Sequence, residues 1–507
     1  MAVPTELNYI DGEWVDGGSD RWITVTDPSH DVAIARVPDS TAAVVDSAVR
    51  AARQAFDEGT WRHLPAEERR AVIVRLAVEL EQRMSLFDEI IPKEAGCPVR
   101  LSGMMQTATP IGMIREMAEW AGLIDDVRAT PITSAPSVGQ SEVRREPVGV
   151  CAGFVPFNFP LFMTIWKSVP PILMGNSVVI KSSPLTPLAS IEFIRACESA
   201  GVPHGVINLV HGDVVAGEAL VEHPDVDHVT FTGSTAVGSR VMASAAPTVK
   251  RLTLELGGKS PSILLPGGDV ELAARAALFA AFMHAGQACV ATTRFLVPDT
   301  SYADALELLR ERTEALVLGP AEDYATDVGP LISDQQLDRV DGMVQRAVEQ
   351  GAKVVVGGRR AEVDADGFYY LPTVLADIRP EMEIAREEVF GPVLAVLRYS
   401  TVEEAVALAN GTDYGLGAAV WGPMVQAREV ARLVQAGTVW INDYGVLAPQ
   451  PFGGYKRSGF GREYGLEGML EYTQIKHIYT SLDGGDLDSR PYGLVGSGWP
   501  DAEEIGR

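Results

Sequence analysis

One cysteine of this chain lies in a setting where a nucleophile can work. Cys289 follows a long alanine-rich helical pattern at 270–283, and the Gly286-Gln287 step between them breaks the helix and lets the backbone approach a bound group. A lone cysteine in apolar surroundings is more often an inert core residue than a nucleophile. Other motifs in the sequence are therefore needed to distinguish a nucleophilic Cys289 from a core cysteine.

Three other motifs supply groups that such a thiol would need. Glu255 precedes a glycine pair in Leu-Glu-Leu-Gly-Gly-Lys-Ser-Pro (254–261), Asn158 lies between prolines in Pro-Phe-Asn-Phe-Pro (156–160), and Glu-Glu-Val-Phe-Gly-Pro (387–392) follows the cysteine. Alone, Asn158 would more often cap its own turn, and Glu255 would be a surface carboxylate at a strand end. Together, a thiol, a carboxylate and an amide donor are the groups that thiol-mediated oxidation of a carbonyl requires.

With its motifs in this order, from about Asn8 to about Tyr479, the sequence resembles the aldehyde dehydrogenase superfamily, in its NAD(P)-dependent, hydrolytic type. The resemblance implies two α/β domains with parallel sheets, a Rossmann-like cofactor domain and a catalytic domain, plus a small β oligomerisation ribbon. The expected ranges are 1–128 and 147–255 for the cofactor domain, 256–460 for the catalytic domain, 129–146 and 461–482 for the ribbon, and 483–507 for a tail of unknown role.

The alternation of patterns along the chain agrees with that fold. Strand patterns at 148–155, 177–181, 206–210 and 226–232 alternate with helical patterns at 161–174, 187–200, 214–222 and 236–245, and a second alternating unit runs from Glu255 to about residue 440. Such alternation indicates βαβ units and a parallel sheet. Upstream we expect a hairpin over 8–27 and helices over 40–57, from Pro65 to Gly96, and over about 101–127.

The resemblance also gives roles to the catalytic candidates. Cys289 would attack the aldehyde carbon, and the Asn158 amide with the Cys289 backbone N–H would bind the oxyanion. Glu255 would activate the water that hydrolyses the resulting thioester. Lys167 and Glu463 match charged family positions near the active site, either as supporting groups or as a plain salt bridge.

For the cofactor, the resemblance implies NAD. The residues that it carries to the cofactor site are Pro156, Phe157, Lys181, Gly233, Ser234, Gly238, Glu388 and Phe390. At Thr232-Gly233-Ser234 a strand runs into a helix start, where free backbone N–H groups suit a phosphate, although such a cap alone is a weak signal. Pro184 stands where the family commonly has a glutamate that repels a 2′-phosphate, so NADP is possible too. NAD is favoured because no further arginine or lysine joins Lys181 in this loop.

The substrate is the least determined part. The expected channel residues are Phe159, Leu161, Phe162, Met163, Trp166, Tyr444, Val446 and Leu447. This apolar and aromatic set favours a hydrophobic or aromatic aldehyde, although aromatic residues on one helix face more often belong to a core. His284, five residues before Cys289, is expected to pack the helix or line the channel rather than to act as a base.

Composition narrows the class of protein further. A net charge of −26 over 507 residues argues against nucleic acid or an anionic membrane as a partner. The four cysteines are too scattered for a disulfide framework, and neither an export signal nor a membrane span is visible, which predicts a cytoplasmic protein. The dispersed histidines give no metal site. Strand patterns at 141–146 and 471–479 predict, through the resemblance, a homodimer or homotetramer formed by strand exchange.

Two other functions stay open at this stage. A CoA-acylating member of the superfamily would resolve the thioester with a thiol, but such members typically lack the glutamate found here as Glu255. A scaffold that keeps only the fold would have lost Cys289, Glu255 or Asn158, and all three are present.

Overall fold

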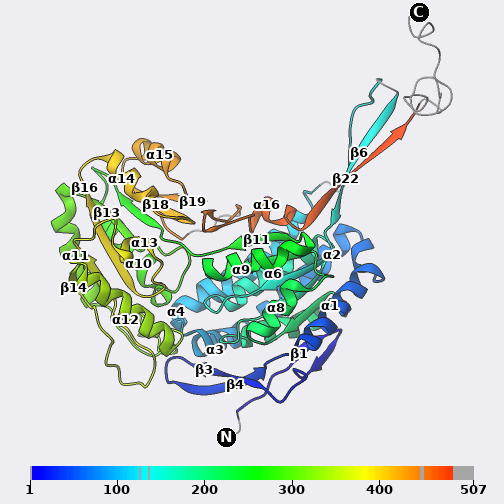
Figure 1. Ribbon diagram of the computed structural model, residues 1–507, viewed down its shortest axis with the longest axis horizontal. Coiled ribbons are helices and arrows are strands. Elements are labelled where there is room, and N and C mark those ends of the chain that lie inside the picture. Colours follow the sequence, from blue (N-terminus) through cyan, green and yellow to red (C-terminus); the bar gives the residue numbers. More distant parts are fainter. Residues whose placement is uncertain (1–2, 125–126, 135–137, 446–449, 483–507) are drawn as a thin grey trace, which may run out of the picture.

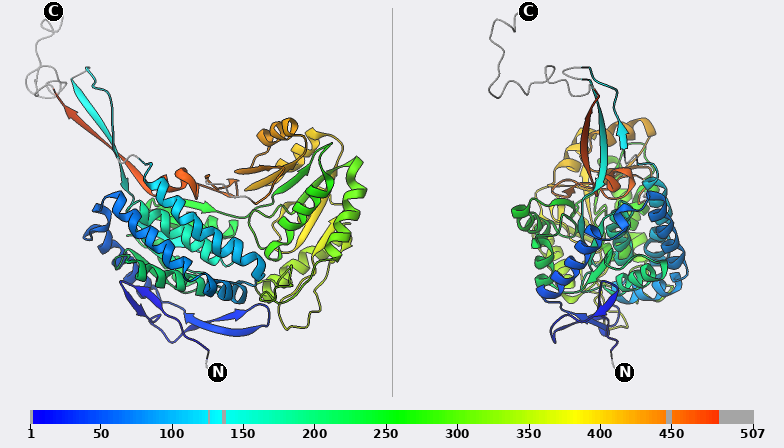
Figure 2. Two further views of the ribbon diagram at one scale, coloured as in Figure 1. Left: turned by 180° about the vertical axis from the view of Figure 1, so that it is seen from behind. Right: turned by 90° about the vertical axis from the view of Figure 1, so that its right-hand side faces the viewer.

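The computed structural model describes residues 3–124, 127–134, 138–445 and 450–482. Two bodies, each built around a sheet, lie side by side, and a narrow ribbon of strands projects from one of them (Figure 1). The same arrangement is seen from behind and from the side in Figure 2. No helix in the described ranges is long and apolar enough to cross a membrane.

The larger sheet contains the strands that the sequence pattern predicts for the cofactor domain. Its order is β2-β1-β9-β8-β7-β10-β11-β21. The bounds are β1 Asn8–Ile10, β2 Glu13–Val15, β7 Val150–Phe154, β8 Ser177–Lys181, β9 Ile207–Val210, β10 His228–Thr232, β11 Arg251–Glu255 and β21 Gly459–Phe460. Strands β7 to β11 pair in parallel. Strands β7, β8 and β9 are buried along their whole length, as expected when helices cover both faces of a parallel sheet.

Helices connect and cover these strands as βαβ units require. Their bounds are α1 Ala42–Asp57, α6 Pro160–Leu173, α7 Leu188–Ala200, α8 Val214–Glu222 and α9 Thr235–Ala245. Every residue of α6 is buried, because this helix lies between the sheet and an outer layer of helices. A helix buried on all sides can hold polar side chains only where they find partners.

The second sheet forms the other body. Its order is β14-β15-β16-β13-β12-β18-β19, parallel except for β14. The strands are β12 Pro261–Leu264, β13 Arg294–Pro298, β14 Lys353–Val356, β15 Thr373–Ala376, β16 Val393–Tyr399, β18 Gly417–Trp421 and β19 Thr438–Ile441. Its main helices are α10 Val270–Phe282, α11 Tyr302–Glu314, α12 Asp334–Glu349, α14 Val402–Asn410 and α15 Met424–Leu433. The expected fold of two α/β domains with parallel sheets is confirmed.

The N-terminal layer differs from the sequence-based expectation. The helix expected from Pro65 to Gly96 is two helices, α2 Ala66–Glu81 and α3 Met84–Ala95. The helix expected over 101–127 is α4 Val99–Ser102, a π-helical turn at Gly103–Ala108 and α5 Thr109–Ala121. Strand β3 Trp22–Asp27 pairs with β4 Val32–Pro38 and not with the first hairpin. Gln82 and Arg83, between α2 and α3, are neither glycine nor proline, so this break had no local signal.

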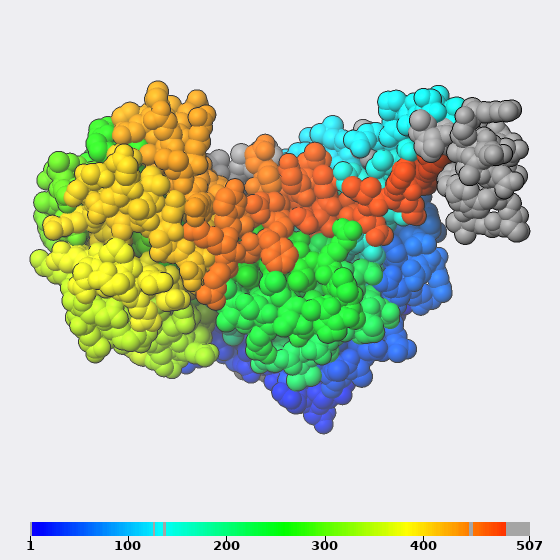
Figure 3. Space-filling view, turned by 45° about the horizontal axis from the view of Figure 1, so that its top comes forward, coloured from blue at the N-terminus to red at the C-terminus, as the bar shows by residue number. Residues whose placement is uncertain are grey.

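The ribbon consists of β5 Val127–Ala129, β6 Gly139–Pro147 and β22 Thr473–Ser481, in the order β22-β6-β5. β6 and β22 pair antiparallel within one chain, with Ser141 opposite Tyr479 and Glu146 opposite Gln474. Most of β22 is exposed. Figure 3 shows the late part of the chain, orange to red, lying across the surface of the molecule toward the ribbon. Strand β21, inside the range predicted for the catalytic domain, joins β11 of the larger sheet.

Candidate active site

Cys289 lies in a sharply turned segment just after α10. His284 and Ala285 have φ angles of 49° and 52°, and Gly286 has a φ of 72°. A Cβ on Gly286 would lie 2.1 Å from the Gly391 carbonyl oxygen, so only glycine fits there. Strain of this kind is kept where the surroundings fix the chain, and it commonly occurs at functional sites.

Gln287 fixes this turn from within. Its Nε2 donates to the carbonyls of His284 at 3.2 Å and Pro330 at 3.4 Å, and its Oε1 accepts from the Ile332 amide at 3.0 Å. The cysteine segment is thereby bound to the loop at 330–332. From the sequence, Gln287 was only part of a helix-breaking step, because its burial beside the nucleophile exists only in the folded chain.

Asn158 is held so that its amide faces the cysteine segment. Its Nδ2 donates to the Gln287 carbonyl at 2.7 Å, and its own backbone carbonyl accepts from Gln106 Nε2 at 3.1 Å. An asparagine amide has two N–H donors, so one of them is left for a ligand. Gln106 lies on the π-helical turn, and nothing in the sequence pointed to it.

Glu255, at the end of β11, is a buried carboxylate. Both of its oxygens lack a hydrogen-bond partner among the residues described. Burial and the charge of Glu463 hold the pKa of the Glu255 carboxyl well above its usual range, while Lys167 acts in the opposite direction. The Gly454 amide is close enough to lower this pKa but is not in hydrogen-bond geometry. A carboxyl with a raised pKa is a stronger base once ionised, which suits general acid–base chemistry.

Lys167 and Glu463 form a buried ion pair behind Glu255. Lys167 Nζ donates to Glu463 Oε1 and, at 2.9 Å, to Thr230 Oγ1, and the Thr230 hydroxyl donates to the same carboxyl oxygen at 3.0 Å. Both charged side chains are almost fully buried. The pair is thus both a salt bridge and a source of charge acting on Glu255. Thr230, in the middle of β10, was not predicted as a site residue, because threonine is common in strands.

The surroundings of Cys289 disfavour the thiolate form. Burial raises its pKa above the usual range, and the charges of Glu255 and Glu388 add to the effect. Formation of the thiolate therefore needs a proton acceptor or a positive charge that arrives with a ligand.

The cofactor candidates lie on two sides of the site. Lys181 lines a cavity of about 270 Å³ between the sheet and helices α8 and α9, whose walls include Val214, Val221 and Phe231. Burial lowers the pKa of Lys181 to about 8. Ser234 caps α9 by accepting from the Val237 amide at 3.4 Å.

The glycines of this region are needed for packing. A Cβ on Gly238 would lie 2.4 Å from Leu256, and one on Gly233 would lie 2.7 Å from the ring of Phe231. These two glycines therefore let α9 approach the sheet closely.

The other cofactor candidates cluster near the cysteine. Glu388 Oε1 accepts from the Gly258 amide at 2.9 Å, and burial raises the pKa of Glu388 to about 7. The ring of Phe390, whose φ is 57°, meets Phe157 edge-on with centroids 5.7 Å apart. Pro156 is half-buried directly before Phe157.

The expected channel residues fall into two groups. Phe159 is half-buried and contacts Phe162 and His284 edge-on, with centroids 6.2 and 5.9 Å apart. Trp166 instead stacks on Tyr464, with centroids 5.0 Å apart, inside a buried aromatic cluster. Leu161 is fully buried, and Met163 almost so.

On the late loop, the Tyr444 hydroxyl donates to the carbonyl of Val290, next to Cys289, at 3.1 Å. Val446 and Leu447 lie outside the described residues. His284 is fully buried, and both of its ring nitrogens lack a hydrogen-bond partner in the part of the chain that the structure covers. Burial lowers the pKa of His284 to about 4, which makes it a poor base for Cys289.

Within the described residues there is no group of three or more histidine, cysteine, aspartate or glutamate side chains that could hold a metal ion. The site consists of a thiol, an amide donor, an unpaired carboxylate and a buried ion pair.

The chain is similar to known proteins over nearly its whole length. The model of the aldehyde dehydrogenase family matches residues 14–478. Betaine aldehyde dehydrogenase of Bacillus subtilis (strain 168) is 39% identical over 93% of this chain and 96% of its own length, and mitochondrial aldehyde dehydrogenase of Homo sapiens is 38% identical over 93% and 91%. A crystal structure of Mycobacterium tuberculosis aldehyde dehydrogenase complexed with NAD+ superimposes with a TM-score of 0.91, at 39% identity, over 94% of this chain and 98% of that one.

The chain belongs to the aldehyde dehydrogenase family. Its activity is that of an oxidoreductase acting on the aldehyde group.

Proposed function

We propose that this enzyme oxidises a hydrophobic or aromatic aldehyde to a carboxylic acid, with NAD as the hydride acceptor and water as the group that releases the product. The proposal that water releases the product rests on the environment of Glu255. This buried carboxylate has no hydrogen-bond partner among the described residues, and its charge acts on Cys289. A carboxylate kept free in this way is available to a water molecule.

The first step forms a bond between Cys289 Sγ and the aldehyde carbon. The thiol proton passes to a solvent water molecule, and the carbonyl oxygen becomes an oxyanion that accepts from the Asn158 amide and the Cys289 backbone N–H. When the oxyanion collapses, a hydride leaves the same carbon and a thioester remains on Cys289. NAD, when bound, supplies the acceptor for that hydride.

The second step removes the acyl group. Glu255 takes a proton from a water molecule, whose oxygen attacks the thioester carbon, and the carbon–sulfur bond breaks to give a carboxylic acid and the Cys289 thiolate. The charge of Lys167 balances that of Glu463, and both act on the pKa of Glu255. The ion pair therefore controls the net charge of the site in which Glu255 takes up the proton.

The donor set fits NAD. The cavity of about 270 Å³ has valine and phenylalanine walls that suit a flat purine, and Lys181 at its edge offers an ammonium donor to a ribose. Glu388 can accept from hydroxyls of a second ribose, beside the rings of Phe157 and Phe390. Since Pro184 carries no charge, NADP is a second acceptor to be tested.

The substrate class is supported by the half-buried ring of Phe159 and its contacts with Phe162. Aromatic walls also attract a quaternary ammonium group by cation–π interaction. Betaine aldehyde, named in the Bacillus relative, is therefore the second candidate substrate.

The deciding experiment follows absorbance at 340 nm with benzaldehyde, long-chain aldehydes, betaine aldehyde and short charged semialdehydes. NAD and NADP are compared, with and without CoA, and Cys289→Ala is the blank. We expect CoA-independent reduction of NAD that is absent in the variant, fastest with the hydrophobic aldehydes. Strict dependence on CoA would overturn the role of Glu255, and faster turnover of the charged semialdehydes would overturn the substrate class.

For the assembly, we propose a cytoplasmic homodimer or homotetramer joined through the ribbon. Within the described residues β22 is an outer strand of its sheet and pairs with β6, and an outer strand of this kind supports such an assembly. Mass by light scattering tests it, and a monomer at micromolar concentration would contradict it.

A further inference from the structure

Asn158 lies in a bend of the chain between β7 and α6, outside any helix or strand. A residue in such a bend has no ladder of backbone hydrogen bonds to fix it, so its position depends on groups that reach it from elsewhere. Two glutamine residues hold Asn158. Gln106 Nε2 donates to its backbone carbonyl at 3.1 Å, and the backbone carbonyl of Gln287 accepts from its Nδ2 at 2.7 Å.

The buried carbonyl of Asn158 needs a donor, because a buried acceptor without one is costly. His284 lies close to this carbonyl: burial lowers the pKa of His284, and the Asn158 carbonyl acts in the opposite direction. Neither ring nitrogen of His284, however, is in hydrogen-bond geometry with any residue that the structure describes. The fully buried Gln106 is therefore the side chain that satisfies the carbonyl.

Gln106 reaches this carbonyl from the π-helical turn at Gly103–Ala108, between α4 and α5. Pro110, at the start of α5, has no N–H, and in a regular α-helix its ring would clash with the carbonyl of Gln106, four residues earlier. The helix widens instead, and the Thr109 N–H and hydroxyl both donate to the Met104 carbonyl, the hydroxyl at 2.8 Å. This turn packs against α6, the helix that follows the Asn158 bend. Single π-helical turns of this kind frequently occur at functional sites.

The carbonyl that accepts from Gln106 belongs to the peptide group between Asn158 and Phe159. Gln106 therefore fixes the rotation of the backbone next to the Asn158 side chain, while the Gln287 carbonyl fixes one of the two amide hydrogens of that side chain. The direction of the second amide hydrogen then follows. This direction matters, because a displacement of about 1 Å at a reacting group can cost roughly 100-fold in rate.

We propose that Gln106 is a positioning residue for the oxyanion donor: its hydrogen bond to the Asn158 backbone sets the direction of the free Asn158 amide hydrogen. This inference rests on the proposed role of Asn158 in binding the oxyanion. Gln106 acts through Asn158 and touches neither substrate nor cofactor. Its loss should therefore slow the chemical step without weakening the binding of NAD.

A double-mutant cycle with Gln106→Met and Asn158→Ala tests this proposal. Methionine has a similar length to glutamine but cannot donate. Single-turnover stopped-flow absorbance at 340 nm, with the full-length enzyme in excess over the aldehyde and NAD saturating, gives the rate constant for formation of reduced cofactor. Once that rate constant no longer rises with enzyme concentration, it does not depend on the fraction of molecules that are folded.

Gln106→Met alone should lower this rate constant roughly 10–100-fold, as a misplaced donor would. In the Asn158→Ala background the same substitution should change it by less than about twofold, because two residues that act as a unit are not additive. Affinity for NAD, measured by fluorescence titration, should be equal in all variants.

Thr107→Val is the matched control on the same π-helical turn. The Thr107 hydroxyl is buried and has no hydrogen-bond partner among the described residues, so its removal should leave the rate constant within about twofold of the wild-type value. Circular dichroism melting shows whether each variant is folded.

An unchanged rate constant in Gln106→Met, beside a loss in Asn158→Ala, would overturn the positioning role of Gln106 and leave the oxyanion donor in place. Equal losses from Gln106→Met in both backgrounds would also overturn it, because Gln106 would then act on the fold and not through Asn158. If Asn158→Ala leaves the rate constant unchanged, the proposed oxyanion role is itself wrong, and the inference fails with it.

Discussion

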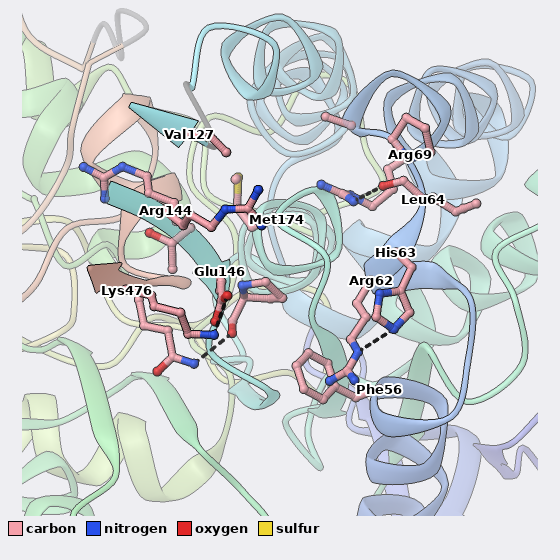
Figure 4. Close-up of a pocket in the computed structure, with 16 residues that line it drawn as sticks. Phe56, Arg62, His63, Leu64, Arg69, Val127, Arg144, Glu146, Met174 and Lys476 are labelled. Atoms are coloured by element: carbon pink, nitrogen blue, oxygen red, sulfur yellow. Dashed lines mark hydrogen bonds and ion pairs between the residues drawn. The ribbon is translucent and has the colours of Figure 1, made fainter. Parts of the chain in front are cut away.

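The site around Cys289 and the ribbon of β5, β6 and β22 each hold a pair of oppositely charged side chains, but the two pairs differ in their exposure to water. Around Cys289, Lys167 and Glu463 are almost fully buried and share one threonine hydroxyl. At the ribbon, Lys476 and Glu146 form a 2.6 Å pair in which the lysine is 54% exposed and the glutamate 33% exposed (Figure 4). A lysine–glutamate pair therefore contributes differently to folding stability and to reactivity in the two regions.

The two ion pairs differ in energy because water reaches one and not the other. A buried charge that loses its partner cannot be stabilised by water, so breaking such a pair costs about 3–5 kcal/mol, whereas exposed pairs typically contribute about 0–1 kcal/mol. Burial also shifts the pKa of a neighbouring carboxyl, as it does for Glu255. In the first region a charged pair therefore acts on the pKa of Glu255, and in the second the pair lies close to water.

The largest expected effect comes from Glu255→Gln, which removes the base but keeps the shape. Steady-state turnover should fall roughly 10²–10⁴-fold, the usual contribution of general base catalysis. A stoichiometric burst of reduced cofactor should persist, because thioester formation does not use Glu255. Stopped-flow absorbance at 340 nm separates the two phases, and loss of the burst as well would contradict the assigned role.

Glu463→Gln breaks the buried ion pair and should destabilise the fold by about 3–5 kcal/mol, because Lys167 keeps its charge without a counterion. Urea unfolding measures this, with the exposed Glu467→Gln as the matched control.

The same variant sharpens the electrostatic argument. The negative charge of Glu463 raises the pKa of Glu255, so its removal lowers that pKa. Hydrolysis needs ionised Glu255 and rises with pH as the proton leaves. The rising limb of the pH–rate profile should therefore move to lower pH, and a shift to higher pH would contradict the coupling.

Asn158→Ala should lower kcat about 10²–10³-fold, as for the loss of one donor to an oxyanion. Affinity for NAD, measured by fluorescence titration, should be unchanged, since Asn158 contacts the cysteine segment through the Gln287 carbonyl. Asn410→Ala, at the C-terminal end of α14, is the control. A loss confined to KM would show that Asn158 acts only in substrate binding.

Pro184→Glu tests a charge of intermediate burial. The added carboxylate should weaken binding of NADP by about tenfold or more relative to NAD, since a like charge near a 2′-phosphate costs on the order of 1.4 kcal/mol or more. Direct binding is measured with 2′,5′-ADP and 5′-AMP. Leu185→Glu places the same charge one residue away as the control, and equal effects of both variants would show that position 184 is not special.

The smallest effect is expected at the exposed pair. Lys476→Gln should change the free energy of unfolding by less than about 1 kcal/mol, and this difference should vanish in high salt. A loss comparable with that of Glu463→Gln would mean that Lys476 is covered in the folded assembly, and that the contrast between the two regions fails.

The sequence by itself determined the alternation of strands and helices in both sheets, because apolar periodicity is local. It also determined the candidates Cys289, Glu255 and Asn158, because their motifs are short and continuous. It placed Lys167 and Glu463 near the site but left their contact open.

Only the tertiary structure decided which groups touch. Thr230 contacts Glu463 across 233 residues of chain, and Gln106 contacts Asn158 across 52. The break between α2 and α3 and the entry of β21 beside β11 are decided in the same way. Local patterns encode which face of an element is buried, but they do not encode what lies against it. The pairing of distant polar groups, and the burial that sets their pKa, exist only once the chain has folded.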